Sequence, residues 1–182
     1  MTEDGKELLK VLYCDSPVDL GKVDESIRRD VFSLLDRFKN IQLEVKPHPR
    51  YPKTVFPLKH HERLTFYGRE DDINVLMVRA GAVITSASTL ILQSIVELKP
   101  TIFYDTWREM MNFTGITICD DTKAVLRASN PSQLYEALQR VMNGWRPKYA
   151  EVNQFYKLYI SNGIPLGGES AERLYHRLCH SS

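Results

Sequence analysis

Short apolar runs alternate along this chain with longer stretches in which apolar and polar residues are mixed. The runs are rich in β-branched and aromatic residues and are closed by proline, glycine or acidic residues, which is typical of β-strands. They occupy residues 8–14, 41–46, 64–68, 82–85 and 100–104, and residues 115–119 are a candidate for one more. The pattern therefore predicts five or six short strands.

The stretches between the runs have helical spacing. One apolar stripe repeats at the interval of a single helix face and contains Ile27, Val31, Leu34, Leu35 and Phe38. Further helical patterns cover residues 71–77, 90–98, 130–143, 148–161 and 170–179. The helix at 130 has the strongest start signal, because an asparagine cap precedes a proline at the first helical position.

A strand followed by a helix, repeated along nearly the whole chain, predicts an α/β fold. We expect a Rossmann-like parallel sheet of five or six strands, with right-handed crossovers that place helices on both faces. The length of 182 residues is that of one ordinary domain, and the sequence shows no internal repeat. Residues 1–182 are therefore expected to form a single Rossmann-like domain.

Composition and charge exclude several classes of protein. Apolar residues make up 43% of the chain and charged residues 26%, which excludes wholesale disorder. The formal net charge of +1 gives no reason to expect a nucleic acid or a membrane surface as partner. The longest apolar stretch, residues 81–98, is interrupted by polar side chains, so no membrane span is predicted.

The cysteines indicate a reducing compartment. The chain has 3 cysteines, widely spaced and without a C-x-x-C motif, which argues against a disulfide scaffold and a structural zinc site. A cytoplasmic location fits this pattern best. His60 and His61 have no further ligand at a metal-binding spacing, and no metal site is predicted.

In a parallel α/β sheet, ligands bind outside the carboxyl ends of the strands. The candidate strand ends are Asp15-Ser16, Pro47-His48-Pro49, the hydroxyl-rich residues 85–89, and Tyr104-Asp105. Hydroxyl groups at the start of a helix suit a phosphate group, because the backbone N–H groups there are free. Plain helix capping explains the same residues equally well.

His48 lies between two prolines, which stiffen the backbone and fix the direction of the imidazole. A rigid histidine at a strand end suits a hydrogen bond to phosphate or a proton transfer; an ordinary surface loop is the alternative. The surrounding basic stretch, residues 46–63, could attract an anion or simply be solvated. The motifs G-x-G-x-x-G, G-x-x-x-x-G-K-[ST] and G-x-S-x-G are all missing, which argues against a standard dinucleotide fold, a P-loop NTPase and a serine hydrolase elbow.

Three short motifs together resemble the C-terminal, donor-binding half of two-domain GT-B transferases. In chain order they are Lys46-x-His48-Pro49, Ser86-x-Ser88-Thr89 and Lys99-Pro100. The order is similar to that of capsule enzymes of the polysialyltransferase type, of CDP-glycerol glycerophosphotransferases and, more remotely, of UDP-N-acetylglucosamine 2-epimerases. The resemblance covers about residues 8–178. It implies that the last helices pack back on the fold.

This resemblance implies a nucleotide-sugar, or a CDP- or CMP-activated donor, as ligand in surface polysaccharide synthesis, without a redox cofactor. His48 would contact the donor phosphates or help the leaving group depart, and Ser86, Ser88 and Thr89 would hold phosphate oxygens. Where the family usually has a glutamate for the ribose hydroxyls this chain has Gln93, with Glu97 one helical turn later. A glutamine can still hydrogen-bond a ribose, but without the strength that a charge adds.

The family's other half supplies the acceptor site, and this chain has no room for it. The resemblance therefore implies that a glycosyltransferase-like activity needs an N-terminal half or a partner chain. Two alternatives remain: a non-catalytic regulatory or scaffolding module with the same fold, and a relative of the sugar-nucleotide epimerases.

Overall fold

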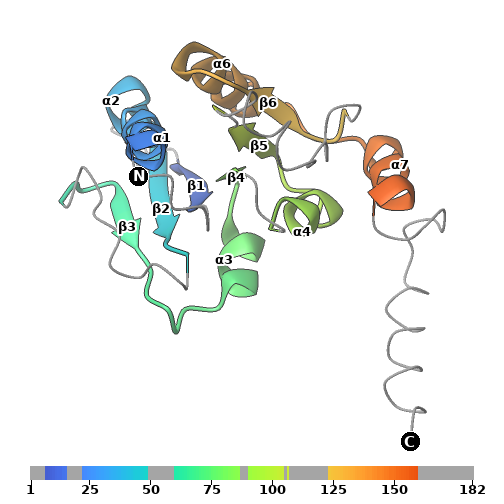
Figure 1. Ribbon diagram of the computed structural model, residues 1–182, viewed down its shortest axis with the longest axis horizontal. Coiled ribbons are helices and arrows are strands. Elements are labelled where there is room, and N and C mark those ends of the chain that lie inside the picture. Colours follow the sequence, from blue (N-terminus) through green and yellow to red (C-terminus); the bar gives the residue numbers. More distant parts are fainter. Residues whose placement is uncertain are drawn as a thin grey trace, which may run out of the picture.

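The computed structural model describes residues 7–15, 22–48, 60–86, 90–104, 106 and 123–159 (Figure 1). The strands are β1 (Leu9–Cys14), β2 (Ile41–Lys46), β3 (Leu64–Phe66), β4 (Ala82–Thr85), β5 (Thr101–Tyr104) and β6 (Leu126–Ala128). The helices are α1 (Lys22–Phe32), α2 (Leu34–Arg37), α3 (Ile73–Arg79), α4 (Leu90–Val96), α6 (Pro131–Met142) and α7 (Tyr149–Tyr159).

All the strand pairs in the sheet are parallel. The strand order is β3-β2-β1-β4-β5-β6, which is the doubly wound Rossmann order. The predicted α/β fold is thereby confirmed. The direction of winding reverses between β1 and β4, so the neighbouring ends of these two strands form the topological switch point.

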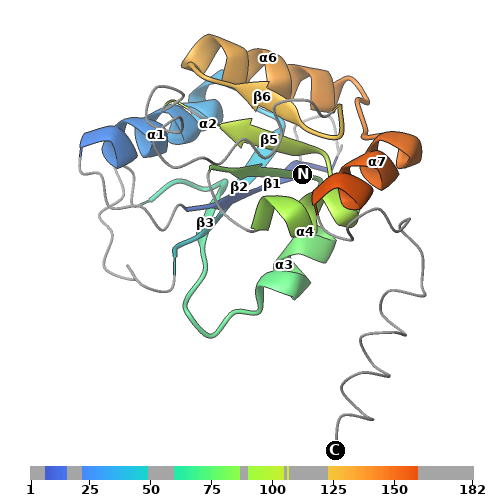
Figure 2. The ribbon, with the colours of Figure 1, turned by 45° about the vertical axis from the view of Figure 1, so that its right-hand side comes forward.

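Helices cover both faces of the sheet, as Figure 2 shows. Val11 and Tyr13 of β1 belong to the core cluster that includes residues of α1, α2 and α6. Leu12 and Cys14, which alternate with them, pack against α3 on the other face. Because both faces are buried, β1 is an almost unbroken apolar run rather than an alternating one. On the α3 face, α7 packs with α4 in a smaller cluster of apolar residues.

Two helix boundaries are set by side chains, one by a local residue and one by a residue far away in the chain. The Asn130 side chain accepts a hydrogen bond from the Gln133 N–H at 3.0 Å, with Pro131 in the first helical position, as the capping signal predicts. At α2, the Arg63 guanidinium donates to three main-chain carbonyls that end α2 and begin β2. The Arg63 side chain, from a distant part of the chain, thus satisfies carbonyl groups that a C-cap residue would otherwise satisfy.

The helical stripe that begins at Ile27 forms two helices rather than one. The division falls at Ser33, whose hydroxyl donates to the Asp30 carbonyl and so competes with the backbone pattern. The sequence pattern also missed β6, because three residues are too few to show an alternation. The strand and the helix predicted at residues 115–119 and 170–179 lie outside the described residues. None of the described helices is long and apolar enough to cross a membrane.

Candidate functional site

The carboxyl ends of β2, β1 and β4 lie next to one another. Cys14, the last residue of β1, pairs with Lys46 on one side and with Thr85 on the other. The residues that follow these strand ends, Pro47-His48, Asp15 and Ser86, therefore form a row across the switch point, which we call the rim. Adjacent strands are about 4.8 Å apart, so the strands that carry His48 and Ser86 are separated by roughly 10 Å.

Asp15 occupies the middle of the rim and is 3% exposed. Its backbone N–H donates to the Lys46 carbonyl at 3.1 Å, which holds it beside β2. Its carboxylate accepts hydrogen bonds from the Tyr13 hydroxyl at 2.9 Å and from Arg28 Nε and Nη2 at 3.3 and 3.2 Å. A buried ion pair thus ties the middle of α1 to the end of β1.

Ser86 follows β4 and is 4% exposed, and its hydroxyl oxygen has no hydrogen-bond partner among the residues that the structure describes. Alternation along β4 directs this side chain toward the face covered by α1, because Ile84 lies in the core on that face. Asp15 lies on the same face, where Arg28 reaches it. A buried hydroxyl without a partner has lost its hydrogen bonds to water, which makes it a candidate contact for a ligand.

Two further buried charged residues, Lys46 and Glu44, lie near the rim on the opposite face of β2. The Lys46 ammonium donates to the Gly68 carbonyl, in the loop between β3 and α3. The neighbouring Cys14 thiol has its pKa raised to about 12, mainly by burial; Lys46 lowers it and Asp15 raises it. This thiol is therefore protonated at neutral pH and is no candidate nucleophile.

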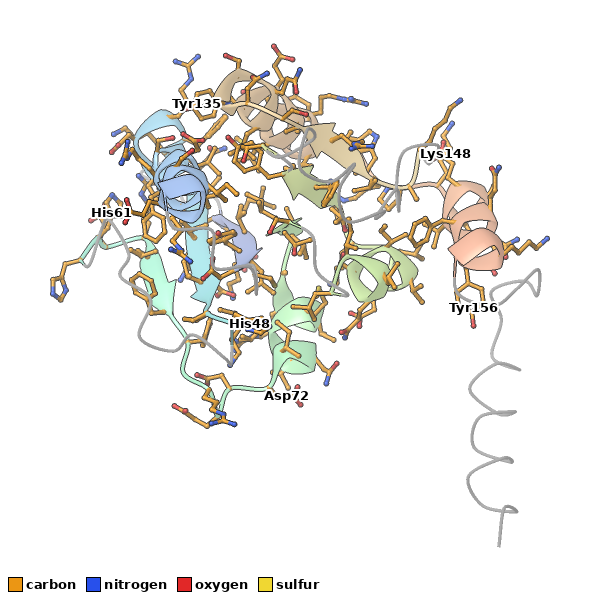
Figure 3. The ribbon with its side chains drawn as sticks, in the orientation of Figure 1. His48, His61, Asp72, Tyr135, Lys148 and Tyr156 are labelled. Carbon is orange, nitrogen blue, oxygen red and sulfur yellow. The ribbon has the colours of Figure 1, made fainter. Side chains whose placement is uncertain are left out.

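His48 is half-buried two residues beyond β2, and Figure 3 shows it on the side of the molecule away from Tyr135. Ser88 and Thr89 lie outside the described residues. That the His48 imidazole lies close to the hydroxyls of Ser88 and Thr89 stays a prediction. Among the described residues, no three or more His, Cys, Asp or Glu side chains come together as a metal site would need.

The two predicted ribose contacts lie close together, Gln93 on α4 and Glu97 in the turn directly after it. The Gln93 amide donates to Asn74 Oδ1 of α3 at 2.7 Å and to Glu97 Oε1 at 2.9 Å. Both amide hydrogens of Gln93 are therefore engaged, and its carbonyl oxygen is the acceptor group of this side chain. Glu97 is about 6 Å farther along the helix from the rim.

A cavity of about 420 Å³ lies elsewhere, between α2 and α6. Its lining residues are Arg37, Phe38, Tyr135, Glu136, Gln139 and Arg140. Phe38 lies three residues before β2 begins, close to the amino end of that strand. Figure 3 shows Tyr135 and His48 on opposite sides of the described part of the molecule. This cavity is therefore separate from the rim.

Sequence reasoning identified Asp15 as a strand end but missed Arg28. The two residues are 13 positions apart, and Arg28 stands beside the apolar Ile27 with nothing local to mark it as buried. The buried Lys46 was part of a recognised motif, although its burial was not foreseen. Residues 41–46 alternate between apolar and polar side chains, so nothing in the sequence indicated that Lys46 is buried.

No known protein family was found to match the sequence, and no curated protein matches it. Solved structures do match it. The wall teichoic acid polymerase TagF has 11% identity and a TM-score of 0.63, with 97% of this chain and 44% of that chain covered. The UDP-GlcNAc 2-epimerase of Methanocaldococcus jannaschii, in complex with UDP-GlcNAc and UDP, has 17% identity and a TM-score of 0.57, with coverages of 96% and 46%.

The S. aureus MnaA–UDP structure has 16% identity and a TM-score of 0.53, with 94% of this chain and 45% of that chain covered. This chain therefore spans a little under half the length of these structures. Similarity at such identities establishes the fold alone. The predicted likeness of this chain to one half of GT-B enzymes is therefore confirmed as a likeness of fold.

Proposed function

We propose that this chain binds the nucleotide-activated donor of a glycosyl or glycerophosphate transfer, at the rim. The observation that carries the proposal is the buried Ser86 hydroxyl, which no described residue hydrogen-bonds, at the switch point of a Rossmann-type sheet. Ligands of such sheets bind outside the carboxyl ends of the strands at this point. A phosphate oxygen would accept the hydrogen bond that this hydroxyl lacks.

The other rim residues take complementary parts in the proposal. His48 contacts the donor phosphates or gives a proton to the leaving group. Ser88 and Thr89 hold further phosphate oxygens, and Gln93, steadied by Glu97, accepts a hydrogen bond from the ribose. Stabilisation of the departing negative charge by such donors is the main catalytic contribution that the site could make.

The acceptor site belongs, in this proposal, to a partner domain or chain, because the chain spans under half of the structures that it matches. Transfer requires donor and acceptor to be held together, so this chain alone is expected to turn over poorly. The proposed setting is the synthesis of a surface polysaccharide.

The test is a panel of UDP, CDP, CMP and GDP, read out by thermal unfolding. At a ligand concentration ten times Kd, binding stabilises the fold by about 1.4 kcal/mol. For a domain of this size that is a rise in Tm of roughly 3–6 °C. His48→Ala should abolish most of this shift, whereas His60→Ala, at an exposed position, should leave it unchanged. No shift with any nucleotide would reject the proposal.

The similarity to the UDP-GlcNAc 2-epimerase supports a second candidate, an epimerase relative. Incubation with UDP-GlcNAc separates the two, because an epimerase changes the sugar without an acceptor. A stable protein partner in the absence of any nucleotide binding would favour instead a regulatory or scaffolding module.

A further inference from the structure

A carboxylate occupies the middle of the rim, where the proposed ligand brings phosphate groups. Asp15 lies one strand spacing from β2, which leads to His48, and one spacing from β4, which leads to Ser86. Its side chain is 2% exposed. In so dry an environment a negative charge acts over several ångströms with little screening and would repel an anion.

The Arg28 guanidinium contacts both oxygens of the Asp15 carboxylate. Its Nε and Nη2 atoms lie 3.3 and 3.2 Å from the two carboxylate oxygens, and its own side chain is only 10% exposed. A guanidinium that contacts both oxygens of a carboxylate is the strongest ordinary form of this pair.

The four charged residues that are buried among the described residues are Asp15, Arg28, Glu44 and Lys46. Two are acidic and two are basic, so their formal charges cancel. Removal of the Arg28 charge would leave this group at −1, with the excess on Asp15 at the rim. Removal of the Asp15 charge would leave it at +1.

We infer that Arg28 is a positioning residue of the donor site, which neutralises Asp15 so that a nucleotide phosphate can bind at the rim. This inference rests on the proposed function. It assigns Arg28 no contact with the ligand. The guanidinium holds the Asp15 carboxylate toward α1, and Asp15 holds its place in the row through its backbone contact with Lys46.

The inference predicts effects of opposite sign, which a purely structural pair would not show. Arg28→Met exposes the ligand to an unpaired carboxylate and should weaken nucleotide binding about tenfold at low salt. Asp15→Asn removes the negative charge at the middle of the rim, where the phosphate would bind, and should tighten binding. The double variant, with neither charge, should return close to the wild-type Kd.

Isothermal titration with the nucleotide found in the panel, at 50 and 500 mM NaCl, measures these changes. Arg28→Lys keeps the charge and should retain most of the affinity. Arg29→Met removes an exposed cation from the next position of the same helix and should change Kd by less than about twofold. The loss of affinity in Arg28→Met should be smaller at the higher salt concentration. Salt ions can screen the repulsion between Asp15 and the phosphate, because the bound phosphate would be open to solvent.

Weaker binding by both Arg28→Met and Asp15→Asn would overturn the inference and leave the proposed function intact. Failure of the wild-type protein to bind any nucleotide would overturn both. If Arg28→Met does not fold, Asp15→Asn decides alone: tighter binding supports the inference, and unchanged or weaker binding overturns it.

Discussion

Replacing Ser86 by alanine should make the free protein more stable while weakening its proposed function. The Ser86 hydroxyl is buried, at a residue that is 4% exposed, and within the described part of the chain it has no hydrogen-bond partner. Burial of such a group without a compensating hydrogen bond costs about 1–3 kcal/mol in proteins. Alanine removes this cost and gives up only the dispersion contacts of one atom.

The expected gain is about 1 kcal/mol in the free energy of unfolding, or roughly 2–4 °C in Tm for a domain of this size. Ser94→Ala is the matched control. Ser94 is 0% exposed, but its hydroxyl donates to the Ile91 carbonyl and accepts from the Thr101 hydroxyl, both at 3.0 Å. Removing this satisfied hydroxyl should destabilise the protein by about 1 kcal/mol.

Urea unfolding followed by circular dichroism measures both variants, with and without nucleotide. A hydrogen bond from a hydroxyl to a charged phosphate contributes about 1.5–3 kcal/mol, so Ser86→Ala should raise the nucleotide Kd by about 10- to 100-fold. The variant should therefore be more stable than the wild type without ligand and should gain much less from it.

Two results would refute this reasoning. A Ser86→Ala protein that is less stable than the wild type without ligand would show that the hydroxyl contributes to the fold itself. An unchanged nucleotide Kd would remove Ser86 from the donor site, whatever the effect on stability.

Three further predictions concern the fold. Arg63→Met removes the donors to three main-chain carbonyls and should cost about 2 kcal/mol in urea unfolding without changing nucleotide affinity. Leu98 has φ 58°, a left-handed conformation at the end of α4, so Leu98→Gly should add about 1 kcal/mol to stability and raise Tm. Because burial raises the Cys14 pKa from 9.0 to about 12, its contribution to stability is complete below pH 9 and is lost between pH 9 and 12. Between pH 9 and 12 the free energy of unfolding should fall with pH less steeply in Cys14→Ala than in the wild type, by about 1.4 kcal/mol per pH unit. The same slope in both proteins would contradict the shifted pKa.

Much of the architecture could be predicted because its signals are local. The strand at 41–46 was found with its observed bounds, since a proline follows directly, and the start of α6 was found from its asparagine and proline. The split of the first helical stripe at Ser33 was missed, because a single hydroxyl bond to the backbone leaves the apolar spacing unchanged.

The sequence by itself determined the alternation of strands and helices, the parallel sheet that follows from it, and the strand ends at which to look for chemistry. These features depend on backbone geometry and on burial repeated over a few residues. Only the tertiary structure decided the strand order that sets Asp15 between His48 and Ser86, the pairing of Asp15 with Arg28, and the burial of the Ser86 hydroxyl away from every described hydrogen-bonding group. Each of these depends on which helix docks on which face of the sheet, and therefore on contacts between residues far apart in the chain.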